Sequence, residues 1–164
     1  YDPTPDFTYG FNIYLEYKNF DFTAFFQGVQ GVDIISDLKK ETDIWAGLNI
    51  GFLNKGRRLL DAWSATNPNS NIPAVSLSDN NNEKRVSSYW VENGSYLKLR
   101  TVQIGYNAPK SFAQKLAMER LRFYLSAQNL FTVKSSSFTG VDPENPNYGY
   151  PIPLNITFGL NVTF

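Results

Sequence analysis

The sequence predicts an all-β fold, in which about five antiparallel strands form the C-terminal segment of a large transmembrane β-barrel. Three observations support this prediction. Five segments alternate apolar and polar residues with period two, which is typical of strands that have one apolar and one polar face. The connections between them alternate between short and long, as in bacterial outer-membrane barrels. The last segment ends on an aromatic residue, Phe164.

The composition excludes several classes of function. Aromatic residues make up 16% of the chain, whereas no stretch approaches the roughly 18 consecutive apolar residues of a transmembrane helix. Fifteen Lys and Arg residues balance fifteen Asp and Glu residues, so no net charge attracts nucleic acid. Cys and His are absent, which removes disulfides, the usual zinc ligands and His-dependent nucleophilic catalysis. We therefore expect no enzyme, no cofactor and no metal site.

The first two strands are predicted as a hairpin over residues 9–17 and 20–26. A two-residue turn at Lys18 and Asn19 brings apolar residues opposite one another, and a shift of one residue would destroy this match. The predicted pairs are Tyr17 with Phe20, Leu15 with Phe22, Ile13 with Ala24, and Phe11 with Phe26.

The third strand, residues 96–106, changes phase partway along. Leu97 and Leu99 share one phase, whereas Val102 and Ile104 share the other. A β-bulge near Arg100 would bring both sets to the same face. The fourth and fifth strands, residues 121–128 and 155–164, alternate without interruption.

The connections place long loops at one edge of the sheet and short turns at the other. We expect residues 29–94 and 131–153 to be extracellular loops and residues 107–120 to be a periplasmic turn. Short helices are predicted over residues 37–48, 54–63 and 110–120. Five strands cannot close a membrane barrel, and the chain opens at Tyr1 without a signal peptide, so we expect a piece of a longer protein. Alternation alone fits a soluble antiparallel β-protein equally well.

Several motifs together carry a family resemblance. They are residues 20–28 (FDFTAFFQG), residues 91–100 (VENGSYLKLR), residues 121–132 (LRFYLSAQNLFT), residues 140–144 (GVDPE) and residues 157–164 (TFGLNVTF). In this order they resemble the SusC/RagA-type TonB-dependent outer-membrane proteins of Bacteroidota. The resemblance implies a 22-stranded barrel in the outer membrane, with an N-terminal plug domain absent from this chain.

The resemblance also implies partners and a transport function. Such proteins import glycans or peptides together with a SusD-like surface lipoprotein, and TonB drives the import through the absent N-terminal part. Two alternatives are kept open. One is an outer-membrane barrel that acts as a scaffold in an assembly or secretion complex, and the other is a soluble all-β carbohydrate-binding module.

The candidate contacts for substrate or partner lie in the predicted loops. Trp45, Trp63 and Trp90 present rings that suit the apolar face of a pyranose, although each also fits a role as a loop anchor. Asp142 and Glu144 flank a proline, and either present two carboxylates to a cation or belong to a stiffened turn. We interpret Asn129 as structural, with its amide hydrogen-bonded to loop backbone.

Overall fold

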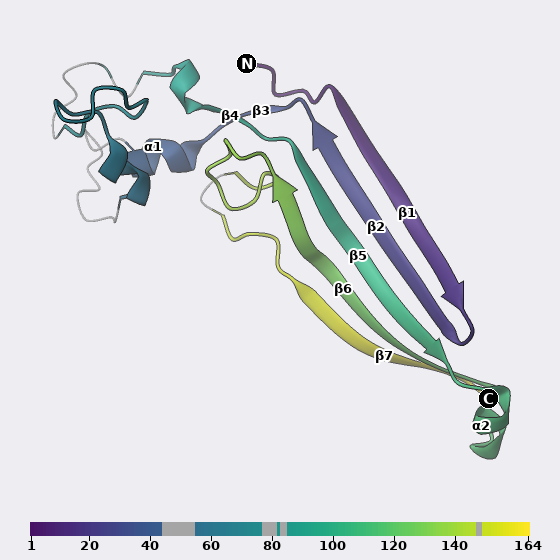
Figure 1. The fold of residues 1–164 in the computed structure, drawn as a ribbon. Coiled ribbons are helices and arrows are strands. Elements are labelled where there is room, and N and C mark those ends of the chain that lie inside the picture. The colour runs from purple at the N-terminus through teal and green to yellow at the C-terminus, as the bar shows by residue number, and fades with distance from the viewer. Residues whose placement is uncertain (44–54, 77–81, 83–84, 147–148) are drawn as a thin grey trace.

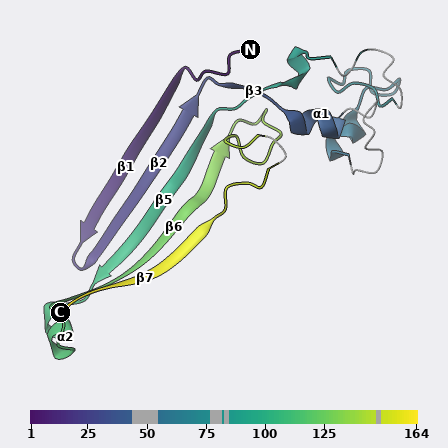
Figure 2. The same cartoon turned by 180° about the vertical axis from the view of Figure 1, so that it is seen from behind.

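The computed structural model describes residues 1–43, 55–76, 82, 85–146 and 149–164. Its main feature is one five-stranded antiparallel sheet with strand order β1-β2-β5-β6-β7 (Figure 1). Each strand lies beside its predecessor in the sheet, and the view from behind shows the same order (Figure 2). The strands are β1 (Phe7–Tyr17), β2 (Phe20–Gln30), β5 (Tyr96–Asn107), β6 (Arg120–Lys134) and β7 (Asn155–Thr163).

The β1–β2 hairpin has the predicted register. The four predicted pairs are all present, from Tyr17 with Phe20 to Phe11 with Phe26. Lys18, the first residue of the turn, adopts a left-handed backbone conformation with φ of 55°. The structure therefore confirms the register that the shared apolar face of the two strands predicts.

The predicted bulge in β5 is also present at Arg100. The pairing of β5 with β2 passes from Thr101 directly to Leu99, which leaves Arg100 unpaired. The pairing of β5 with β6 shifts at the same place. On β6 the irregularity includes Asn129, with φ of 55°, a conformation that Asn adopts more readily than most residues.

The two faces of the sheet differ sharply in chemistry. In every second row of paired residues, four rows in all, the side chains are apolar or aromatic across the sheet. They are Phe11–Phe26–Leu99–Phe131, Ile13–Ala24–Val102–Ala127–Ile156, Leu15–Phe22–Ile104–Leu125–Phe158 and Tyr17–Phe20–Tyr106–Phe123–Leu160. The rows between them carry mainly polar residues, Gly and Tyr, as in Tyr14–Thr23–Gln103–Ser126–Thr157. We call these the apolar face and the polar face.

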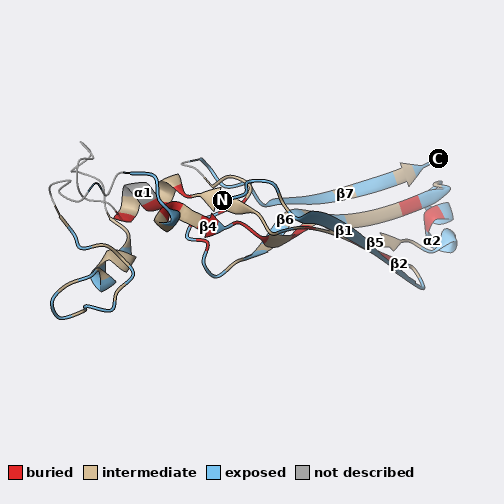
Figure 3. Ribbon diagram, turned by 90° about the horizontal axis from the view of Figure 1, so that it is seen from above, coloured by how far each residue is buried: buried red, intermediate tan, exposed pale blue. Residues whose placement is uncertain are grey.

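The apolar face has no covering layer among the described residues. Phe158 is 71% exposed, and Leu15, Ile104 and Leu125 are exposed as well. Buried residues gather instead around the loop end, near α1 and β4, while β7 is exposed along most of its length (Figure 3). An ordinary soluble sheet buries its apolar face against a second layer.

The connection between β2 and β5 forms short elements of its own. A small antiparallel pair joins β3 (Asp33–Ile35) to β4 (Val91–Asn93), and sequence reasoning missed it. The helix predicted from residue 37 is present as α1 (Asp37–Asp43), and its predicted remainder lies outside the described residues. Two short 3-10 helices follow, η1 (Arg57–Asp61) and η2 (Ser88–Trp90).

The helix predicted over residues 54–63 is only the five-residue turn η1. Its Leu60 is exposed and none of its residues is buried, so no packed apolar face extends it into an α-helix. The strands also run further than predicted, to Gln30 in β2 and Lys134 in β6. The two long connections therefore begin slightly later than residues 29 and 131.

The connection between β5 and β6 is short and lies at the opposite end of the sheet. It contains α2 (Lys110–Lys115), which is shorter than the predicted helix over residues 110–120 and lies beside the C-terminus (Figure 1). The N-terminus lies at the other end, near the long connections (Figure 1). Among the described residues, no helix is long and apolar enough to span a membrane.

Candidate functional site

Charged side chains from β5 meet the connection between β6 and β7 at the loop end of the polar face. Tyr96, Lys98 and Arg100 all belong to β5, and Asp142 and Glu144 belong to the connection. We call these five residues the loop clasp, and the described residues 135–146 and 149–154 the last loop. Alternation along β5 places Tyr96 and Lys98 on the polar face, in the rows of Thr8 and Gln27.

Lys98 is the centre of the loop clasp. Its ammonium lies 2.5 Å from Glu144 Oε2 and 3.2 Å from both carboxylate oxygens of Asp142. Only 1% of Lys98 is exposed to solvent. Lysine is rarely buried unless its charge is paired, so the two carboxylates account for the position of this ammonium.

Glu144 joins three side chains of β5. Tyr96 donates a hydrogen bond of 2.6 Å to Glu144 Oε1, and the Arg100 guanidinium also donates to that oxygen. Arg100 Nε donates to Gln27 Oε1 at 2.7 Å, which fixes the guanidinium against β2. Burial tends to raise the pKa of Glu144, but the hydrogen bonds from Lys98 and Tyr96 and the nearby cations lower it overall.

The residues between the two carboxylates form a tight turn. The Asn145 amide donates to the Asp142 carbonyl at 3.0 Å, and the Glu144 amide donates to Asp142 Oδ1 at 3.0 Å. The predicted turn around Pro143 is therefore present. The carboxylates of Asp142 and Glu144, on either side of it, contact the Lys98 ammonium of the same chain. No group of three or more Asp, Glu, His or Cys residues that could hold a metal occurs within the described part of the chain.

A second polar cluster fixes the start of the last loop. Both carboxylate oxygens of Glu92, on β4, accept hydrogen bonds from Thr139, at 3.0 Å from its amide and 2.7 Å from its hydroxyl. Lys39 of α1 lies 3.9 Å from Glu92 and 4.0 Å from the ring centre of Tyr89. Burial lowers the pKa of Lys39, and the charge of Glu92 opposes this shift. Glu92 thus links α1 to the last loop.

The same cluster continues to η1 through Asp43. Tyr89 donates a hydrogen bond of 2.7 Å to Asp43, and Arg58 forms an ion pair of 3.1 Å with the same carboxylate. Burial and the hydrogen bond to Asp43 raise the pKa of Tyr89, so this phenol stays protonated near neutral pH. These contacts tie η1 to α1 and η2.

A third polar cluster lies near the opposite end of the polar face. Arg122 of β6 pairs with Asp21 of β2 at 2.5 Å, across the intervening strand β5. Asn107 adds a hydrogen bond of 3.1 Å to Asp21. Gly105 lies beneath this pair, and a Cβ there would lie 2.5 Å from both Asp21 oxygens and would clash with the guanidinium. A glycine on β5 therefore makes room for the ion pair.

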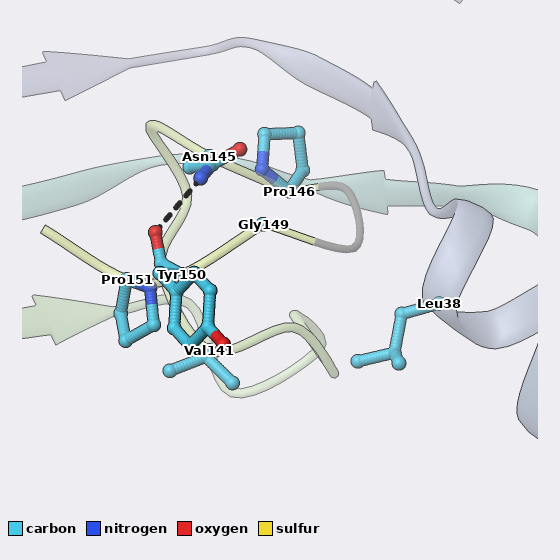
Figure 4. A pocket seen from close by; sticks show the side chains of 7 residues that line it. All are labelled: Leu38, Val141, Asn145, Pro146, Gly149, Tyr150 and Pro151. Carbon is cyan, nitrogen blue, oxygen red and sulfur yellow. Dashed lines mark hydrogen bonds between the residues drawn. The ribbon is translucent and has the colours of Figure 1, made fainter.

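A pocket of about 380 Å³ lies between the last loop and α1. Asn145 donates a hydrogen bond of 3.0 Å to the Tyr150 carbonyl across it, and Leu38 approaches from α1 (Figure 4). The other lining residues are Val141, Pro146, Gly149 and Pro151. None of the described residues that line it has a charged side chain, so the pocket suits an uncharged group.

The predicted contact residues fall in different surroundings. Trp90 is 1% exposed and donates its indole N–H to the Arg85 carbonyl at 3.0 Å, so little of its ring is available to a ligand. Trp63 is 49% exposed, and Trp45 lies outside the described residues. The structure brings Asp142 and Glu144 together around Lys98. Among the described residues, neither carboxylate forms a hydrogen bond with Trp63 or Trp90. A ligand contact by any of these residues remains a prediction.

Sequence reasoning missed the basic partners in the loop clasp. Lys98 and Arg100 are 44 to 46 residues from their acidic partners, so no local spacing links them. One signal was available, because a strand predicted to cross a membrane carries two cations near one end. The interpretation of Asn129 is consistent with the structure, since its amide donates to the Pro153 carbonyl at 3.3 Å.

Comparison with known proteins gives several relatives, although no family model matches the chain. TonB-dependent receptor P3 of Formosa agariphila is 38% identical over 99% of this chain and 17% of its own length. TonB-dependent receptor P26 of the same organism is 35% identical over 99% of this chain and 17% of its own length. The chain therefore spans about a sixth of the length of these relatives.

The solved structures of RagAB contain the same fold. The RagAB peptide transporter aligns with a TM-score of 0.80 and 29% identity, over 99% of this chain and 18% of the other. The RagAB peptide importer in its closed-closed state aligns with a TM-score of 0.80 and 28% identity, over 98% and 17%. The chain is thus homologous to a segment of the TonB-dependent receptors of Bacteroidota and to a segment of the RagAB transporter.

Proposed function

We propose that this chain is the C-terminal segment of the 22-stranded barrel of a TonB-dependent importer. In this proposal the apolar face contacts lipid and the polar face lines the barrel interior. The observation that carries it is the apolar face itself, which runs unbroken over four rows of residues and lacks a covering layer among the described residues. In a barrel, lipid covers such a face.

The free edges of the sheet support the same proposal. β1 and β7 are the first and last strands of the sheet order, so each has one edge without a partner among the described residues. Unpaired backbone groups in lipid cost several kcal/mol each, so an open sheet is unstable there. The rest of the barrel supplies the missing neighbours, and the plug and the segment that contacts TonB belong to the remainder of the protein.

The alternation of long and short connections supports one orientation of the sheet in the membrane. The long connections from β2 to β5 and from β6 to β7 are the extracellular loops, and the short connection from β5 to β6 is the periplasmic turn. The loop clasp then lies near the cell surface, whereas the Asp21–Arg122 pair lies near the periplasm. Of the predicted contact residues, Trp63 is the exposed one among those described, and in this proposal it faces substrate or partner.

The substrate is a peptide or a glycan, taken up together with a SusD-like surface lipoprotein. RagAB, which has the same fold over this region, is a peptide transporter, and this similarity favours peptides. The uncharged lining of the pocket beside the last loop is compatible with either class. The alternative is an outer-membrane scaffold for assembly or secretion, which shares the barrel but moves no nutrient.

Deletion of the gene for the full-length receptor tests the proposal in its native bacterium. Uptake of labelled peptides and of labelled oligosaccharides is measured in the deletion strain and in a strain complemented with the intact gene. We expect uptake of one class to fall and to recover on complementation. Unchanged uptake of both classes, with loss of another surface protein, would favour the scaffold.

A further inference from the structure

We infer that the last loop folds inward over the polar face and is held there by the loop clasp as a fixed wall of the barrel mouth. The inference rests on the proposed function in one respect, because it takes the polar face as the barrel interior. It assigns to Lys98 and Arg100 the role of positioning residues. Neither residue needs to contact the substrate.

The direction of the loop follows from the face that its carboxylates reach. Lys98 lies in the row of Gln27 and Thr132, and Tyr96 lies in the row of Lys134, all on the polar face. Asp142 contacts Lys98 directly, and Glu144 accepts a hydrogen bond from Tyr96. A loop that folded outward over lipid could not bring its carboxylates to this side of the strand.

The burial of the charges indicates that the loop is held firmly. The loop clasp contains two cations and two carboxylates beside Tyr96, so its formal charges balance. Because Lys98 is almost fully buried, separating the loop from β5 would leave either a bare ammonium or bare carboxylates in a poorly hydrated place. The paired state is therefore the stable one, and the loop is held to the wall.

A second contact fixes the beginning of the same loop. The paired hydrogen bonds from Thr139 to Glu92 lie three residues before Asp142, and Phe138 beside them is buried. Residues 138–144 are thus attached at both ends, to β4 and to β5. Val141 lies between the two attachments and lines the pocket, so the attachments set the position of that pocket wall.

Distances between spin labels in the purified full-length receptor test the inference. The labels are placed by Val141→Cys on the last loop and Ser126→Cys on the polar face of β6, in a background without other cysteines. We expect one narrow distance distribution in the parent receptor. We expect a broad distribution in the Lys98→Met variant, and cleavage by chymotrypsin after Phe138, which is buried in the parent, about tenfold faster, because hydrogen bonds to charged groups are lost.

Two further variants keep the test decisive. Glu144→Gln lies in the loop and leaves every strand residue intact, so it loosens the loop even if Lys98→Met fails to fold. Asp61→Asn removes an exposed carboxyl group from the other long connection and serves as the matched control. A narrow distribution that persists in Lys98→Met and Glu144→Gln, or a broad one in the parent, overturns the inference. The measurement needs no transport, so it stands apart from a failure of the proposed function.

Discussion

Replacement of Phe158 by lysine tests directly which solvent the apolar face contacts. Phe158 is the fourth of the nine residues of β7 and lies in the row of Ile104 and Leu125. A nine-residue strand is about 30 Å long, and with a tilt of about 40° it spans most of the roughly 25 Å apolar band. Phe158 is therefore close to the middle of the membrane. Thr157 is its neighbour on the polar face and provides the matched control.

The expected penalty has two parts. A lysine near the midplane on the lipid face of a barrel costs about 2–4 kcal/mol. Loss of the phenyl ring from an apolar environment adds about 1.5–3 kcal/mol. We therefore expect Phe158→Lys to lower the free energy of unfolding by about 4–7 kcal/mol, and Thr157→Lys by less than about 2 kcal/mol, because the polar face is hydrated.

Equilibrium unfolding of the full-length receptor in lipid vesicles measures both variants. Denaturant titration, followed by tryptophan fluorescence, gives the free energy of unfolding of each, and resistance to heat on a gel reports the assembled barrel. If Thr157→Lys were as costly as Phe158→Lys, or costlier, the assignment of the two faces would be wrong. If neither variant lowered the free energy of unfolding, β7 would lie outside the membrane.

Three further predictions concern single sites. Gly105→Ala should lower the free energy of unfolding by about 1–3 kcal/mol, because the new methyl group displaces the Asp21–Arg122 pair; Gly10→Ala, whose Cβ would have no neighbour nearer than 3.2 Å, should cost less in the same titration. Because the pKa of Glu144 lies below its usual 4.5, the loop clasp should persist from pH 8 to 5 and weaken only as the pH falls below about 4.5, toward the lowered pKa. The mobility of a spin label on the last loop measures this release, and release already at pH 6 would contradict the prediction. Trp90→Ala should increase hydrogen exchange in β4 by a hundredfold or more, since truncation of a buried tryptophan costs about 3–5 kcal/mol, and equal exchange in the parent and the variant would contradict this.

The sheet was predictable because each of its strands repeats a simple rule. In the hairpin, only one register pairs Leu15 with Phe22 and keeps every apolar side chain on one face. In β5, the change of phase between Leu99 and Val102 requires one extra residue, and the structure has it at Arg100. Both features follow from alternation within a few residues.

The loop elements were not predictable from such local patterns. β3 and β4 have three residues each, too few to show alternation, and they are separated by more than fifty residues. Their position depends on the burial of Trp90 against Ile35 and Tyr89. The ion pairs of the loop clasp likewise join residues far apart in the sequence, so the carboxylates of the last loop were visible as candidates while their partners were not.

The bulge and the loop clasp are two aspects of the same feature. Without Arg100, Leu99 and Thr101 would be adjacent, and the pairing of β2 with β5 would continue without interruption. The extra residue is therefore unnecessary for the apolar face. It is nevertheless the residue that contacts both Gln27 and Glu144. Because bulges often re-aim a side chain at a functional rim, the irregularity in β5 is best explained by the loop that it holds.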